Sequence, residues 1–289
     1  MSTNSVTPRT SRSAIGLAGC VALVQRMAAN LQRWIVALGR RPQARAPRWP
    51  AGAMVAIALI VAGTVASMFL IDAPVTGWAR HLPLWLIGPA DEVTNFGLSG
   101  WFLYPLGFSL LFLAAVTTPT LPPMVQGVLA LVVGRVGFLF TAIALPSLFA
   151  TIAKRLIGRA RPFVGPHDDP FAYMPFIWRP EYASMPSGHA TTAAAAAIAI
   201  GAIWPRLRVP MWLYALIIMC SRVIIDVHHP SDVIAGGLVG VIGALIVRRW
   251  FAERQLAFSA DLRALPGPSW RQLKDAARSI VHGATDSAN

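Results

Sequence analysis

Residues 209–247 read VPMWLYALIIMCSRVIIDVHHPSDVIAGGLVGVIGALIV, two apolar runs on either side of a short polar segment. Counted with their polar ends, the runs approach the length of a membrane-crossing helix, about 20 residues. The polar segment, residues 221–232, carries an arginine, two histidines and two aspartates. Such groups are costly in a membrane unless they face protein, water or a ligand. The stretch therefore predicts two membrane helices that meet at a functional site.

The composition of the whole chain supports a membrane protein. Of its 289 residues, 55% are apolar and 13% are charged, whereas soluble domains carry about a quarter charged residues. Six segments are expected to span the bilayer: Ala53–Ile71, Gly100–Val116, Gly127–Ala153, Ala190–Trp204, Val209–Val227 and Asp232–Val247. The fourth is short and alanine-rich, so we expect it to pack inside the bundle, where small residues permit close helix approach. The predicted fold is an all-α, six-helix transmembrane bundle.

The N-terminal arm, residues 1–51, is basic and has helical periodicity. Its first 50 residues hold eight arginines and no acidic residue. Apolar residues recur at helical spacings, with Arg26, Arg33 and Arg40 on the opposite side. The pattern indicates a basic amphipathic helix on a membrane surface, with a flexible arm as the alternative. The predicted organisation is this arm, a membrane domain over residues 52–252 and a cytoplasmic tail over residues 253–289.

Arginines indicate the orientation of the spans. Six spans place the arm, the Arg206–Arg208 turn and the Arg248–Arg249 pair on one side, which the positive-inside rule makes cytoplasmic. The net charge of +13 is explained by these flanking arginines near anionic lipid. A nucleic-acid partner is not expected, because no soluble domain carries a basic stripe with interleaved aromatic residues.

Three polar clusters fall on the other side of the membrane, which in a bacterial-type inner membrane is the periplasmic side. Lys154 and Arg161 close the third span, and their seven-residue separation puts them on one face if the helix continues. Ser187, Gly188 and His189 open the fourth span, with Ser187 as a natural N-cap and a helix N-terminus suited to an anion. The third cluster is the opening segment, in which Asp232 is four residues beyond His228 and is expected to hydrogen-bond its ring.

Together the clusters supply what phosphoryl transfer requires. They contain three cations (Lys154, Arg161 and Arg222), a hydroxyl, a helix N-terminus, two histidines and a carboxylate. Such a set can bind phosphate oxygens, provide a nucleophile and protonate a leaving oxygen. The sequence has no carboxylate cluster suited to magnesium and no metal-ligand spacing, so no metal or other cofactor is expected, and the cations would take the metal's part.

These residues resemble the type 2 phosphatidic acid phosphatases, which share their site with vanadium haloperoxidases. The K-x6-R-P pattern matches Lys154, Arg161 and Pro162. The P-S-G-H pattern matches residues 186–189, and the S-R-x5-H-x3-D pattern matches Ser221, Arg222, His228 and Asp232. Every position of the three patterns is met, in order, over about 80 residues. A soluble haloperoxidase is disfavoured by the hydropathy of the chain.

The resemblance implies a role for each residue. His228 would be the nucleophile that forms a phosphohistidine, and Asp232 would orient it. His189 would protonate the leaving alkoxide and then activate water. Lys154, Arg161, Ser187, Arg222 and the Gly188 N–H would hold the phosphate oxygens. The family is metal-independent, with its site at the outer membrane–water interface.

The expected function is a membrane lipid phosphatase, with substrates in the bilayer such as phosphatidate, phosphatidylglycerol phosphate, undecaprenyl diphosphate or lipid A. Asp168 and Asp169 lie in the aromatic loop Phe163–Met185. They slightly favour lipid A among these substrates, because their carboxylates can bind an amine or sugar hydroxyls. Two alternatives remain: a phosphotransferase that uses the same phosphohistidine, and a protein that only binds lipid phosphates. His229 and Asp226 have no assigned role, and local hydrogen bonding is expected for both.

Overall fold

The computed structural model describes residues 11–164 and 169–286, and this part of the chain is helical without strands. The α-helices are α1 (Ser11–Gly39), α2 (Ala51–Leu70), α3 (Asp72–Ala79), α4 (Leu84–Thr94), α5 (Gly100–Val116), α6 (Pro123–Ile157), α7 (Gly188–Ile203), α8 (Arg208–Ile224), α9 (Pro230–Glu253) and α10 (Trp270–Asp286). Three short 3₁₀ helices are η1 (Asn95–Gly97), η2 (Pro180–Tyr182) and η3 (Pro205–Leu207).

The chain divides into two units, each described here by itself. The first consists of residues 1–41, 108–133 and 267–289, and the second of residues 42–107 and 134–266. In the first unit, Asn30 of α1 donates hydrogen bonds to the carbonyl oxygens of Ala114, at 2.8 Å, and Thr117, at 2.9 Å. These bonds satisfy carbonyl groups at the C-terminal end of α5, which have no partner within the helix.

Five helical segments among the described residues are long and apolar enough to cross a membrane. They are Ala51–Leu70, Leu84–Val116, Pro123–Ile157, Pro205–Ile224 and Pro230–Glu253. The second begins earlier than expected: the region before Gly100, predicted as a loop, forms α3, α4 and η1, because its apolar residues favour helix over an exposed connection. The chain is an integral membrane protein, and its outer helices expose large side chains such as Leu59 and Phe108.

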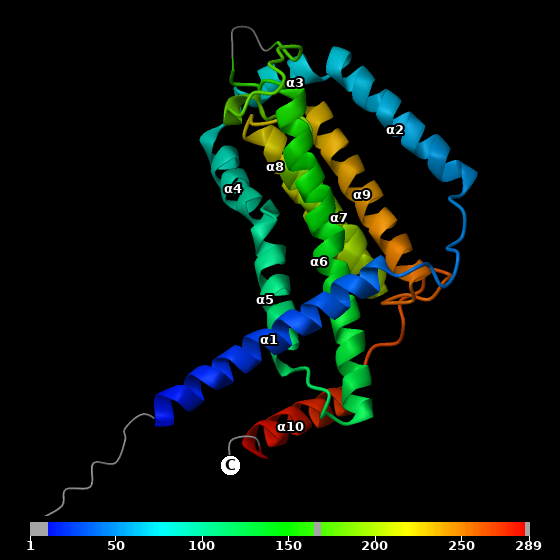
Figure 1. Cartoon of the computed structure of the whole chain (residues 1–289). Helices are drawn as coiled ribbons and strands as arrows, with labels where there is room; N and C mark the ends of the chain where they lie inside the picture. The colour runs from blue at the N-terminus through cyan, green and yellow to red at the C-terminus, as the bar shows by residue number, and fades with distance from the viewer. Residues whose placement is uncertain (1–10, 165–168, 287–289) are drawn as a thin grey trace, which may run out of the picture. The chain divides into compact units, whose positions relative to one another are not determined.

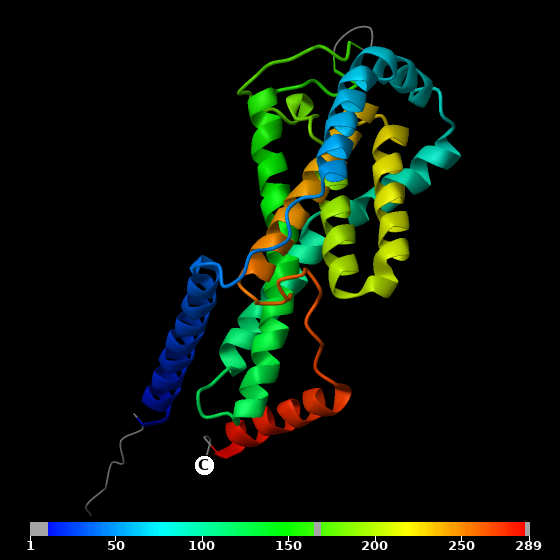
Figure 2. The same ribbon diagram turned by 90° about the vertical axis from the view of Figure 1, so that its right-hand side faces the viewer.

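The fourth predicted span corresponds to α7, which has 16 residues, fewer than the five long segments, and is buried along most of its length. It is an antiparallel neighbour of α8, joined to it by η3 (Figure 2). On its other side it meets α9 (Figure 1). A Cβ atom at Gly236 or Gly240 of α9 would lie 2.4 Å or 2.3 Å from a carbonyl oxygen of the α7 segment, so only glycine permits this approach.

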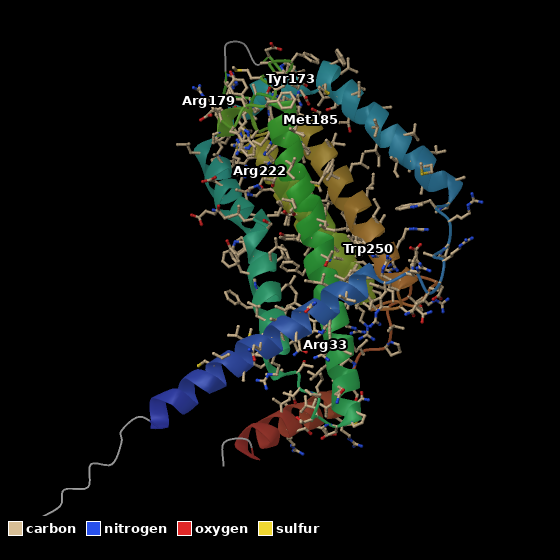
Figure 3. The ribbon with its side chains drawn as sticks, viewed as in Figure 1. Arg33, Tyr173, Arg179, Met185, Arg222 and Trp250 are labelled. Carbon is tan, nitrogen blue, oxygen red and sulfur yellow. The ribbon has the colours of Figure 1, made fainter. Side chains whose placement is uncertain are left out.

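The arrangement of α6 to α9 sets the position of the polar clusters. The C-terminal end of α6, the N-terminal end of α7, the C-terminal end of α8 and the N-terminal end of α9 carry them. Figure 3 shows Arg222 at the same end of this unit as Tyr173 and Met185, and Trp250 at the opposite end. The fold therefore concentrates the predicted site at one end of the second unit.

Candidate active site

The N-terminus of α7 forms the floor of the site. Ser187 occupies the N-cap position in an extended conformation, but its hydroxyl makes no capping hydrogen bond. The side chain is fully buried, and its Oγ has no hydrogen-bond partner among the described residues. A Cβ atom at Gly188 would lie 3.0 Å from Nζ of Lys154. The ammonium group of Lys154 and the free N–H groups of α7 thus face the same space, where an anion would be stabilised.

The second cation, Arg161, does not share a helical face with Lys154. The helix α6 ends at Ile157, and Gly158 has a φ of 64° in the left-handed region. A Cβ atom there would lie 1.8 Å from the carbonyl oxygen of Met174, so glycine is required at this turn. The prediction of a shared face was therefore wrong, because it assumed a continuous helix, and Arg161 instead approaches from the following loop.

Arg222 completes the group of cations from the last turn of α8. It is buried, with 6% of its side chain exposed, and its Nη1 donates a 2.7 Å hydrogen bond to Oγ1 of Thr94. The Nε atoms of Arg222 and Arg161 are buried and have no partner in the described part of the chain. Each unpaired guanidinium N–H costs free energy unless a ligand accepts its hydrogen bond.

His228 and Asp232 are close but are not directly hydrogen-bonded. Nδ1 of His228 lies 3.8 Å from Oδ2 of Asp232, longer than a hydrogen bond. The hydroxyl of Ser184 lies between them, 2.5 Å from Oδ2 and 3.4 Å from Nδ1. The predicted pairing is thus indirect. Because Nδ1 faces Asp232, Nε2 is the nitrogen left to meet a ligand.

The ionisation state of His228 suits a nucleophile. Burial lowers the pKa of its ring to about 4, although the charge of Asp232 opposes the shift. The imidazole is therefore neutral at neutral pH. A neutral ring nitrogen keeps the lone pair that attacks phosphorus.

A buried ionic cluster behind Asp232 was not predicted from the sequence. Arg159 is fully buried, and its Nη1 donates a 2.6 Å hydrogen bond to Oδ1 of Asp232. Its Nη2 donates a 2.8 Å hydrogen bond to Oδ2 of Asp72, which also accepts from the hydroxyl of Ser231. A second Asp72 oxygen accepts the backbone N–H of Ser231 at 3.0 Å. The cluster fixes the Asp232 carboxylate and the start of α9 relative to α3.

Of the two unassigned residues of the opening segment, His229 makes the expected local hydrogen bond, whereas the expectation was wrong for Asp226, which pairs with an arginine 146 residues away. His229 takes part in a capping box at the start of α9, in which its backbone N–H donates to Oδ2 of Asp232 at 3.0 Å. Asp226 lies in the left-handed region, with a φ of 53°, and pairs with Nε of Arg80 at 3.1 Å. Both residues therefore shape the turn between α8 and α9.

The loop before α7 contributes exposed aromatic side chains. Phe176 and Trp178 are 74% and 78% exposed, as suits residues at a membrane interface. Asp169 accepts a 2.8 Å hydrogen bond from the backbone N–H of Phe171, which gives its carboxylate a local role. Asp168 lies outside the described residues.

Eight predicted site residues lie in one unit and at one end of it: Lys154, Arg161, Ser187, Gly188, His189, Arg222, His228 and Asp232. His189 directly follows Gly188 in α7, so it belongs to the helix N-terminus that the Lys154 ammonium group approaches. No cluster of three or more His, Cys, Asp or Glu side chains suited to a metal ion occurs among the described residues.

Comparison with known proteins assigns the family. Residues 135–256 match the model of the PAP2 superfamily. A lipid A 1-phosphatase from Rhizobium johnstonii is 33% identical over 212 residues, 73% of this chain and 84% of that relative. The chain belongs to the PAP2 superfamily. It is a PAP2-type membrane phosphatase.

Two further similarities accompany this assignment. A lipid A 1-phosphatase from Rhizobium etli is 34% identical over 193 residues, 66% of this PAP2 chain and 82% of that relative. A crystal structure of a transmembrane PAP2 type phosphatidylglycerolphosphate phosphatase from Bacillus subtilis aligns with a TM-score of 0.46 and 19% identity, covering 67% of this chain and 93% of the other.

The PAP2 match includes Arg159 and Ser184 but not Asp72, because it begins at residue 135. Arg159 lies between the two matched residues of the K-x6-R-P pattern, so a signal for it was present in the sequence. Ser184 lies two residues before the P-S-G-H pattern, where nothing distinguished it from other loop serines. Asp72 directly follows the first predicted span and belongs to none of the three patterns.

Proposed function

We propose that this PAP2-type phosphatase hydrolyses a lipid phosphate in two steps, with a phosphohistidine on His228 between them. The observation that carries the proposal is the group of buried, unpaired donors: Oγ of Ser187 and Nε of Arg161 and Arg222. Three such buried donors, at the end of the unit where α7 begins, would be costly without an anion to accept their hydrogen bonds. A phosphoryl group has the oxygens to satisfy them.

In the first step, Nε2 of His228 attacks phosphorus and the bond to the leaving oxygen breaks. His189 donates a proton to that oxygen, so an alcohol leaves. In the second step, His189 takes a proton from water, and the hydroxide attacks phosphorus, breaks the P–N bond and releases inorganic phosphate. Asp232 stabilises the positive charge on His228 through the Ser184 hydroxyl and by direct Coulomb attraction.

The phosphate oxygens are held by the three cations and by α7. Lys154, Arg161 and Arg222 balance the negative charge that the equatorial oxygens carry in the transition state. Ser187 Oγ and the Gly188 N–H donate hydrogen bonds to the same oxygens. These donors are in place before the substrate binds, so little reorganisation is needed during the reaction.

For the substrate, we propose a lipid A-type glycolipid phosphate in the outer leaflet of a bacterial-type inner membrane. Support comes from two relatives that are named lipid A 1-phosphatases, of which this chain covers 84% and 82%. The proposed topology has six spans, with α7 as the short one and both termini cytoplasmic. The arginines at η3 and at the end of α9 would then be cytoplasmic, and the site would be on the opposite face.

The test is inorganic phosphate release by the full chain in detergent with EDTA present. The panel is lipid A, phosphatidylglycerol phosphate, phosphatidate and undecaprenyl diphosphate. His228→Ala should lose at least about 1,000-fold in turnover, because it removes the nucleophile. The control is His81→Ala, since His81 is an exposed histidine whose ring hydrogen-bonds the carbonyl oxygen of Gly77 at 2.8 Å, outside the site.

Normal turnover by folded His228→Ala would contradict the phosphohistidine. Loss of phosphate release on chelation would contradict a metal-free mechanism. If the wild type used phosphatidate much faster than lipid A, the glycolipid substrate would be wrong while the phosphatase chemistry stood.

A further inference from the structure

A separate polar pocket opens beside His189, within the second unit. Its volume is about 130 Å³, and it lies between the η1–α5 turn, α6 and α7. Gly188 and His189, two residues of the proposed phosphate site, line it. The pocket therefore adjoins the proposed phosphate site on the side of the proposed acid.

Hydroxyl groups dominate the wall of this pocket. Ser99, Ser147, Thr151 and Thr192 all line it. Oγ of Ser147 and Oγ1 of Thr192 are 3.1 Å apart and share one hydrogen bond. A hydroxyl has one donor and two acceptor positions, so this single bond leaves capacity for a ligand.

The polar lining is local and is not a general property of the bundle. A larger groove between α6 and α9, of about 440 Å³, is lined by apolar residues and glycine, among them Phe149 and Ile242. Hydroxyls gathered in an otherwise apolar membrane bundle cost free energy unless polar groups meet them. The pocket beside His189 is thus suited to a polar ligand and the groove is not.

The geometry of the reaction assigns this space to the leaving alcohol. In phosphoryl transfer the leaving oxygen lies opposite the nucleophile, so it points away from His228. It must also lie within reach of the acid, His189. The carbon atoms attached to that oxygen then enter the pocket that His189 lines.

Gly97 brings the backbone close to the proposed acid at the side of this pocket. A Cβ atom at Gly97 would lie 2.9 Å from Cδ2 of His189 and 2.5 Å from Cγ2 of Ile218. The 3₁₀ turn η1 therefore packs against the imidazole and bounds the pocket.

We propose that Ser99, Ser147 and Thr192 bind the hydrogen-bonding groups that the leaving alcohol carries next to its reacting oxygen, and that this alcohol is a sugar or polyol. This inference rests on the proposed function, because it assigns the leaving-group side of the same site. In phosphatidylglycerol phosphate the carbon next to the phosphate-bearing carbon carries a free hydroxyl, and in the glucosamine of lipid A 1-phosphate that position carries an amide N–H, so both leaving alcohols can donate to the pocket. The diacylglycerol formed from phosphatidate has ester groups there and cannot donate to the pocket.

The experiment compares the full-length wild type, the double variant Ser147→Ala/Thr192→Val and the control Thr141→Val. Thr141 is also on α6, but its hydroxyl donates to the carbonyl oxygen of Gly137 at 2.7 Å and does not line the pocket. For each variant, kcat/KM is measured on lipid A, phosphatidylglycerol phosphate and phosphatidate. Binding of dephosphorylated lipid A and inhibition by vanadate are measured in parallel.

The double variant should lose about 10- to 100-fold in kcat/KM on the substrates whose leaving alcohol can donate to the pocket, because two hydrogen-bonding partners are removed. The kcat/KM of the double variant on phosphatidate should stay within about two-fold of the wild type. Its inhibition by vanadate should also stay within about two-fold, since neither measurement depends on the pocket. Loss on lipid A alone would identify a sugar, and loss on phosphatidylglycerol phosphate as well would include glycerol.

Equal losses on all three lipids, or no loss on any, would overturn the assignment. Failure of the proposed function itself has a different signature. If the wild type released no phosphate from any lipid, but the double variant bound dephosphorylated lipid A more weakly, the phosphatase proposal would fall and the pocket would stand. If the double variant bound dephosphorylated lipid A as tightly as the wild type, the assignment of the pocket would be overturned, whatever the turnover.

Discussion

At the scale of single residues, the buried guanidinium of Arg159 holds the Asp232 carboxylate in position. It lies between two carboxylates with no exposure to solvent, and it is the only guanidinium bonded to Asp232 in the described part of the chain. Removing one partner of a buried ion pair leaves the other charge uncompensated, which costs more than the pair itself contributes. The position of Asp232, and through it of His228, therefore depends on a residue outside the motif positions.

We expect Arg159→Leu to destabilise the protein by about 3 to 5 kcal/mol, because Asp72 and Asp232 would remain buried without a counter-charge. Thermal unfolding in detergent measures the effect. The control is Arg263→Leu, since Arg263 forms an exposed pair with Asp261, with side chains 86% and 56% exposed. A variant of Arg159 as stable as that of Arg263 would show that the cluster contributes little.

At the scale of elements, the contact between α7 and α9 positions the catalytic groups. The N-terminus of α7 carries Ser187, Gly188 and His189, and the N-terminus of α9 carries Asp232. Their backbones meet directly, since the N–H of Ser187 donates to the carbonyl oxygen of Asp232 at 2.9 Å. Glycines along α9 allow the two helices to stay close below this bond.

We expect Gly240→Ala to lower both stability and kcat/KM. Its Cβ atom would lie 2.3 Å from the carbonyl oxygen of Thr191, and overpacking of this kind costs about 1 to 3 kcal/mol. The matched control is Gly137→Ala on α6, where a Cβ atom has no neighbour within 4 Å. That change should be neutral or stabilising, because alanine favours helix over glycine. Equal stability and equal kcat/KM in the two variants would argue against close packing between α7 and α9.

At the scale of the whole molecule, the two ends of the helices in the second unit differ in the side chains they carry. The end of the second unit that carries the site also carries the aromatic loop, and the cations there belong to the proposed phosphate site and its buried cluster. The arginines of η3 and of the C-terminal end of α9 have no such ligand to account for them. Basic residues favour the cytoplasmic side, and aromatic residues favour either interface. The distribution supports a site that faces away from the cytoplasm.

Cysteine labelling in intact cells tests this orientation. In a background where Cys20 and Cys220 are replaced by serine, Arg179→Cys should react with a membrane-impermeant maleimide, because Arg179 is exposed in the aromatic loop. Arg206→Cys, in η3, should react only after the membrane is permeabilised. The reverse pattern would invert the topology.

The sequence by itself determined the membrane class, the long apolar helices and the three motifs, because these depend on local hydropathy and short spacings, whereas α3 and α4 were not predicted. Ser187 is at the N-cap position of α7, as its place in the sequence predicted. Lys154 and Arg161 were placed on one helical face wrongly, because the left-handed turn at Gly158 depends on contact with Met174 in the following loop.

Only the tertiary structure decided which residues from distant parts of the sequence lie next to the motif residues. Asp72 and Arg159 are 87 residues apart in sequence, and Ser147 and Thr192 are 45 apart. Neither pairing is visible in local periodicity, which repeats over a few residues and carries no information about which helices become neighbours. The packing of α3, α6, α7 and α9 brings these groups together, and so determines how Asp232 is held and which alcohol fits beside His189.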